Sequence, residues 1–191
     1  MESVVFTQLI IAAATLLASL GGYLLAGMNE RRRDGRTLAR ELQLRGAERE
    51  SRRNDEAHAF QRETLLALQD AVQLMARLTY EAMHFDHMQA RGGKYTLLPD
   101  TLSDKMHSNG VEVRRLASRV LDAGVRAAVD TFKDTSARLS TSPRHLQGLI
   151  GDGLENRATS DMMELHERFE TLTAVLGEAV RREIAWRPAV D

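Results

Sequence analysis

The longest apolar stretch of the chain lies close to its first residue. Between Glu2 and Glu30 no side chain carries a charge, and most of residues 4–28 are apolar. A helix needs about 20 such residues to cross roughly 30 Å of hydrocarbon. A cleavable secretory signal would instead carry positive charge before a shorter apolar core. Residues 1–29 are therefore predicted to form a single transmembrane anchor.

Positive charge follows this stretch at once, as the cluster Arg31, Arg32, Arg33 and Arg36. Flanks rich in Lys and Arg stay on the cytoplasmic side of a membrane. We therefore expect a single-pass protein of the cell membrane that contacts membrane lipid. Its N-terminus should lie outside and its C-terminal domain in the cytoplasm.

Small residues recur every four positions within the apolar stretch, as Ala14, Ala18, Gly22 and Ala26. They form one stripe along a helix, and in lipid such stripes let two helix backbones approach closely. The stripe predicts packing between spans and hence a homo-oligomer. The alternative is that Ala and Gly are simply common in membrane helices.

Residues 30–56 are dominated by charge, with nine Arg and seven Asp or Glu. Their only large apolar residues are Leu38, Leu42 and Leu44, too few to build a core. Acidic and basic side chains four residues apart, such as Glu41 and Arg45, favour a solvated helix. This segment is predicted to be a charged helical stalk that self-associates along Leu38 and Leu42.

From Ala57 the pattern becomes that of an amphipathic helix with two adjacent apolar stripes, which predicts a wide buried face. The first stripe is Phe60, Thr64, Ala67, Ala71, Leu74, Leu78, Ala82 and Phe85, and the second is Leu65, Leu68, Val72, Met75, Thr79 and Met83. Gly92 and Gly93 are expected to end this helix.

Two further helices are predicted after a loop that reaches Pro99, with Asp100 or Thr101 as the N-cap. One is centred on residues 113–132 and is expected to break or restart at Asn109-Gly110. Residues 140–160 are the weakest for regular structure, with Pro143 able to start a short turn. The last helix is expected to begin near Ser160 and to end at Pro188. Residues 57–187 should thus form an antiparallel bundle of about three helices, which makes the fold all-α.

Composition agrees with helices and excludes some chemistry. Three prolines and nine aromatic residues in 191 point away from a β-rich fold. The absence of cysteine excludes disulfides and thiolate chemistry. A net charge of −1 gives no global basic field, so no nucleic-acid partner is expected.

One group of residues has a spacing similar to that of metal ligands in helical bundles. Glu81, His84 and His87 stand at i, i+3 and i+6, and di-iron bundles use Glu-x-x-His motifs in pairs. A second motif is missing here, because Met163 stands three residues before His166. The sequence therefore predicts no metal ligand set and no cofactor.

Two Arg-x6-His spacings occur, one from Arg77 to His84 and one from Arg138 to His145. This spacing is similar to that of the RNA-cleaving helical HEPN domains. The resemblance implies a phosphate-handling pair of Arg and His. In that family a polar residue usually follows the Arg, whereas Leu follows both arginines here.

Two hypotheses follow from the sequence. The leading one is a membrane-anchored cytoplasmic interaction or scaffold protein that self-associates or docks a protein partner, without catalysis. The alternative is a membrane effector, whose span oligomerises into a pore or whose bundle is an RNA-cleaving HEPN-like enzyme. The pore version is motivated by the small-residue stripe and by the polar residues Gln8, Thr15 and Ser19 within the span.

Overall fold

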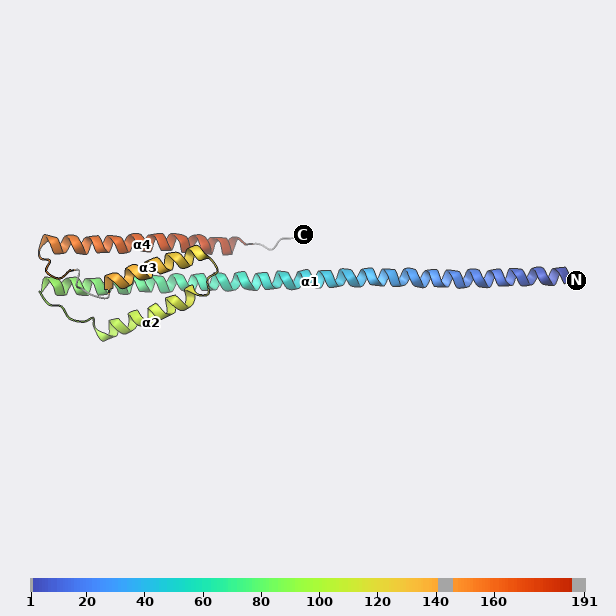
Figure 1. Cartoon of the computed structure of the whole chain (residues 1–191), viewed down its shortest axis with the longest axis horizontal. Helices are drawn as coiled ribbons and strands as arrows, with labels where there is room; N and C mark the ends of the chain where they lie inside the picture. The colour runs from blue at the N-terminus through green and yellow to red at the C-terminus, as the bar shows by residue number, and fades with distance from the viewer. Residues whose placement is uncertain (1, 141–145, 187–191) are drawn as a thin grey trace. The chain divides into compact units, whose positions relative to one another are not determined.

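The computed structural model describes residues 2–140 and 146–186 of the chain, with side chains at positions 15, 19, 22, 38, 40–140 and 146–186. The described residues form four helices and no strand, which confirms the all-helical prediction. The helices are α1 (Glu2–Arg91), α2 (Asp100–Ala117), α3 (Ala123–Ser140) and α4 (Asp152–Ala185) (Figure 1).

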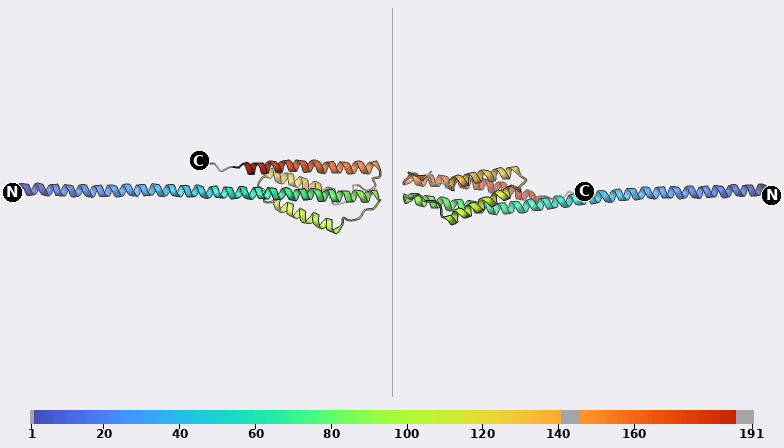
Figure 2. Two further views of the ribbon diagram at one scale, coloured as in Figure 1. Left: turned by 180° about the vertical axis from the view of Figure 1, so that it is seen from behind. Right: turned by 60° about the horizontal axis from the view of Figure 1, so that its bottom comes forward.

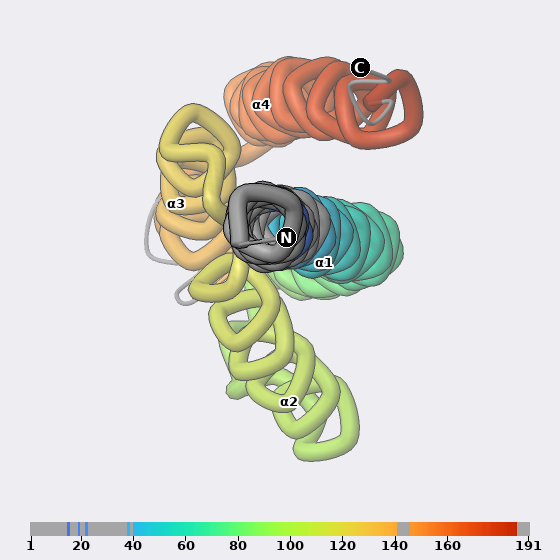
Figure 3. Tube along the Cα trace, turned by 90° about the vertical axis from the view of Figure 1, so that its right-hand side faces the viewer, coloured from blue at the N-terminus to red at the C-terminus, as the bar shows by residue number. Residues whose placement is uncertain are grey.

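The chain divides into two compact units, Met1–Arg53 and Asn54–Asp191. In the first unit, the described backbone is helical throughout. The second unit contains the last part of α1 together with α2, α3 and α4. Its helices form the bundle, with α3 lying between α2 and α4 (Figure 3).

The bundle core confirms the apolar stripes that were read from the sequence. Leu65, Leu68 and Val72 of α1 are at most 2 % exposed and belong to one core cluster with buried side chains of all three other helices. The partners from those helices are Val113, Leu116, Val125, Val129, Phe132, Leu165, Leu172 and Leu176. Phe60 departs from the pattern, because its ring is 49 % exposed.

The bundle has four helices rather than about three, because the predicted second helix breaks at a different place. Asn109 and Gly110 lie inside α2, and the chain turns between Ala117 and Ala123. The Asn109 side chain is buried and its Nδ2 donates to the Ala71 carbonyl oxygen at 3.0 Å. This bond ties α2 to α1, so a residue type common in turns serves here as a buried contact.

The starts of two helices also differ from the sequence predictions. Pro99 precedes α2, so Asp100 lies inside the helix and no side chain caps its start. The last helix, α4, begins at Asp152 rather than near Ser160, after Gly151 with a φ of 51°. It ends at Ala185, whereas Pro143 and Pro188 lie outside the described residues. Gly92 and Gly93 do follow the end of α1, and Gly93 has a φ of 64°, which favours glycine.

Asp122 caps α3 and connects it to α4. Its Oδ1 accepts a hydrogen bond from the Val125 N–H at 3.0 Å, and its Oδ2 accepts one from Arg182 at 2.6 Å. These two hydrogen bonds, the Val125 bond foremost, hold the pKa of the Asp122 carboxyl below its usual value. An N-cap with this pattern stabilises a helix start by about 0.5–2 kcal/mol.

We expect Asp122→Ala to lower the free energy of unfolding by about 0.5–2 kcal/mol near pH 7, measured by denaturant titration. Because the folded pKa is depressed, the carboxylate stabilises the fold above its unfolded pKa of about 3.9. This stabilisation by the Asp122 carboxylate is lost as the pH falls through its lower pKa in the folded state. Asp122→Asn, which keeps a capping oxygen, should therefore match wild type in acid and fall below it at neutral pH. Equal stability of Asp122→Ala and wild type at pH 7 would contradict the capping role.

Candidate functional site

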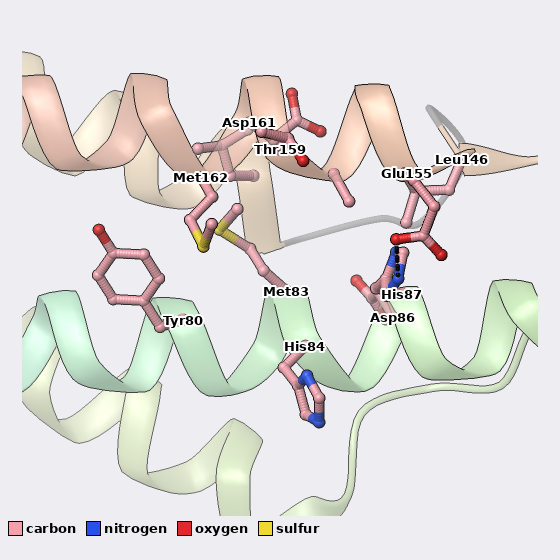
Figure 4. A pocket seen from close by; sticks show the side chains of 12 residues that line it. Tyr80, Met83, His84, Asp86, His87, Leu146, Glu155, Thr159, Asp161 and Met162 are labelled. Carbon is pink, nitrogen blue, oxygen red and sulfur yellow. Dashed lines mark ion pairs between the residues drawn. The ribbon is translucent and has the colours of Figure 1, made fainter. Parts of the chain in front are cut away.

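A cavity of about 230 Å³ lies inside the second unit, between α1 and α4 (Figure 4). Its lining combines apolar side chains with several titratable groups. The apolar part comes from Tyr80, Met83, Leu139, Leu146, Ala158 and Met162, and the polar part from His84, Asp86, His87, Glu155, Thr159 and Asp161. A concave, largely apolar site with a few converging polar groups is the usual form of a small-molecule pocket.

His87 and Glu155 connect the two helices that face each other across this cavity. The His87 Nε2 atom lies 3.4 Å from Glu155 Oε2, and Arg91 Nε lies 3.5 Å from Glu155 Oε1. The His87 side chain is 15 % exposed, and its buried Nδ1 has no hydrogen-bond partner among the described residues. Figure 4 shows the imidazole and the carboxylate reaching toward each other from α1 and α4.

Two carboxylates of the lining, Asp86 and Asp161, are only 2 % exposed. Arg157 Nε lies 3.1 Å from Asp161 Oδ1, four residues apart on α4. Burying a carboxylate is costly unless a charge or hydrogen bonds compensate. Asp161 therefore lines the cavity and also stabilises α4 through its contact with Arg157.

Tyr80 of α1 is another lining residue of the cavity. Burial, and then the nearby charge of Glu170, raises the pKa of its phenol above the usual value. The hydroxyl is thus protonated at neutral pH and can donate a hydrogen bond. The cavity can accept a small, mostly apolar molecule.

A second polar cluster joins α1 and α4 toward the C-terminal end of α4. His58 Nδ1 lies 2.6 Å from Glu183 Oε2, and the His58 ring stacks on Trp186 with centroids 4.1 Å apart. Gln61 completes the cluster: its Nε2 donates to the Arg119 carbonyl oxygen at 2.9 Å, and its Oε1 accepts from the Leu121 N–H at 3.0 Å. This cluster holds the turn between α2 and α3 against α1.

The structure does not bring Glu81, His84 and His87 together as a metal site. Glu81 and His84 are exposed. Figure 4 shows His84 on the side of α1 away from Glu155, whereas His87 points toward Glu155. In the described ranges no group of three His, Asp or Glu side chains could hold a metal ion.

The two Arg-x6-His spacings are not brought together as a site by any described contact. Arg77 is exposed on α1, and Arg138 of α3 forms an ion pair with Glu164 of α4. His145 lies outside the described residues. Arg138 is thus paired with Glu164 rather than with a histidine, and the described contacts give the HEPN-like hypothesis no geometric support.

The residues predicted to act in the membrane belong mostly to the undescribed side chains. Ala14, Ala18, Ala26 and the four arginines at 31, 32, 33 and 36 fall in this group. Gly22 is described, and a Cβ placed on it would meet nothing within 4 Å. Among the residues that the structure describes, no helix is long and apolar enough to cross a membrane. The span and its stripe remain predictions.

Sequence reasoning missed Asp86, Glu155 and Asp161 as a set that shares one cavity with His87. A signal was present for two of them. Asp86 stands four residues after the buried Ala82, and Asp161 stands four residues before the buried Leu165. A charged residue on the apolar side of a helix is unusual enough to mark a candidate site.

Comparisons of this chain with protein-family models, with curated proteins and with solved structures find no match. The described residues define a structural class, an all-helical fold whose second unit is a bundle of four helices with a small pocket.

Proposed function

We propose that this chain is a membrane-anchored interaction protein, whose bundle lies in the cytoplasm and which self-associates or docks a protein partner without catalysis. The observation that carries the proposal is the exposure of Leu38 and Leu42, which are 59 % and 60 % exposed. Both lie on one side of α1, four residues apart, in a segment dominated by charged side chains.

A single solvated helix with this composition has little to stabilise it. The Glu41–Arg45 ion pair has its atoms 4.0 Å apart and both side chains more than half exposed, so it contributes at most a few tenths of a kcal/mol. Most helix stability in proteins comes from packing an apolar side against a neighbour. A second copy of the segment that covers Leu38 and Leu42 would supply that packing.

The predicted anchor is supported by the uncharged stretch, and one described contact inside this stretch is compatible with a membrane helix. Ser19 Oγ donates to the Thr15 carbonyl oxygen at 2.8 Å. In hydrocarbon a polar group must find its partner within the protein, and a hydroxyl bonded to its own helix meets this requirement.

The experiment is cross-linking of the full-length chain in membranes. The double variant Leu38→Gln, Leu42→Gln should reduce the cross-linked dimer or higher oligomer several-fold, because both changes remove apolar area from the association surface. The matched control is Leu66→Gln. Leu66 lies in the bundle unit, and its side chain is 47 % exposed. Unchanged cross-linking in the double variant would refute association through the stalk.

A third variant separates the stalk from the predicted stripe. Gly22→Ile places a bulky side chain in open space, where only a neighbouring helix would meet it. Loss of cross-linking in Gly22→Ile but not in Leu20→Ile would assign the contact to the span. Loss in the leucine variant alone would assign it to the stalk.

A further inference from the structure

An open groove of about 610 Å³ runs between α2 and α3, with Met75 of α1 at its floor. Its α2 side is one helical face, since the lining residues recur every three or four positions as Asp100, Ser103, Met106, His107, Gly110, Val111 and Arg114. Its α3 side is formed in the same way by Lys133, Ser136, Ala137 and Ser140. Figure 2 shows α2 diverging from the other helices toward its N-terminal end.

One end of the groove is apolar and exposed. Leu97 and Leu98 precede α2 and line this end together with Met106, and Leu97 is 92 % exposed. Val111, farther along α2, is 53 % exposed. Apolar side chains gathered in one concave surface gain free energy when a ligand removes them from water.

The other end carries positive charge. Arg114 lies fourteen residues after Asp100, which is about 21 Å along α2. Its side chain is exposed, and its guanidinium forms no ion pair within the described part of the chain. Lys133 also lines the groove, with its Nζ 3.0 Å from Asp130 Oδ1. Asp100, at the far end of α2, is the one acidic residue of the described lining.

The size of the groove suits a small molecule. It lies within the range of about 300–1,000 Å³ that is usual for ligand sites.

We propose that this groove binds a long-chain fatty acid. The carboxylate pairs with Arg114, because guanidinium and carboxylate form strong charge-assisted hydrogen bonds. The acyl chain runs along Val111 and Met106 toward Leu97 and Leu98. The groove belongs wholly to the second unit, so this inference does not depend on the predicted span.

The test uses the full-length chain in neutral phosphatidylcholine vesicles with a photoreactive palmitate. Labelled peptides are then mapped by mass spectrometry. Label is expected within residues 97–114 and 133–140. Photoreactive hexadecanol, of equal length but uncharged, and a photoreactive phosphatidylcholine are the comparison probes, and both should label the groove about tenfold less, as expected for loss of one charge-assisted hydrogen bond.

Two variants test the two halves of the site. Arg114→Gln should lower palmitate labelling about tenfold, whereas Arg168→Gln, at an exposed arginine of α4, should leave it unchanged. Gly110→Trp should abolish labelling by filling the groove, because a Cβ at Gly110 meets nothing within 4 Å. Gly153→Trp is its control on α4, where a Cβ also meets nothing.

Circular dichroism verifies that each variant is folded. Labelling that is absent from the groove, equal with hexadecanol or phosphatidylcholine, or retained in Arg114→Gln or Gly110→Trp would overturn the proposal. Efficient labelling confined to residues 4–28 would mean that palmitate only partitions into the bilayer, and this too would overturn it.

Discussion

A reporter that is active only outside the cytoplasm is expected to be inactive when it is fused after Asp191. The reason is the asymmetry of positive charge: four arginines lie between positions 31 and 36, and none precedes the apolar stretch. Such asymmetry sets the orientation of a single span. The measurement is the activity of the fused reporter in intact cells, and the expected effect is close to all or none.

Two further measurements test this topology prediction. A reporter that is active only in the cytoplasm should be active at the same position. Replacing Arg31, Arg32, Arg33 and Arg36 with Ser and inserting three Lys after Met1 should raise the signal of the first reporter, since the positive flank then lies on the other side. An active outside reporter on the unaltered chain would disprove the orientation and the cytoplasmic placement of the bundle.

Phe132→Ala is expected to lower the free energy of unfolding of the bundle by about 3–5 kcal/mol. Phe132 is 1 % exposed, and its ring packs against Phe169 with centroids 6.0 Å apart and planes tilted by 50°. Truncation removes both the buried area and the ring contact, and it leaves a cavity among the helices. Because domains are stable by about 5–15 kcal/mol, this loss should bring the unit close to unfolding.

The measurement is denaturant unfolding of the full-length chain followed by circular dichroism. Phe60→Ala is the control, because the Phe60 ring is 49 % exposed and its removal should cost far less. Phe132→Leu, which keeps most of the apolar volume, should fall between the two. Equal destabilisation by Phe60→Ala and Phe132→Ala would show that α3 does not form the centre of the core.

The pocket between α1 and α4 shows how contacts between distant parts of the chain define a candidate site. His87 and Glu155 are 68 positions apart in the sequence, and their side chains meet only because α4 packs against α1 in the bundle. The same packing buries Asp86 and Asp161. The periodicity of one helix contains no information about which charged residue of another helix it will face.

Helix class and the buried side of α1 are properties that the sequence determined by itself. The spacing of Leu65, Leu68 and Val72 places them on one side of any helix, because 3.6 residues make a turn wherever the helix stands. Gly93 could end α1 for an equally local reason, since its positive φ is easily reached only without a Cβ.

Only the tertiary structure decided where the second helix breaks and where the last one begins. Asn109 is a turn-former by local preference, yet burial against the Ala71 carbonyl keeps it within α2. Asp122 ends up as a cap for α3 and a partner of Arg182 on α4, sixty positions away. Local preferences differ by about 1 kcal/mol or less per residue, so a few packed or hydrogen-bonded contacts between helices override them.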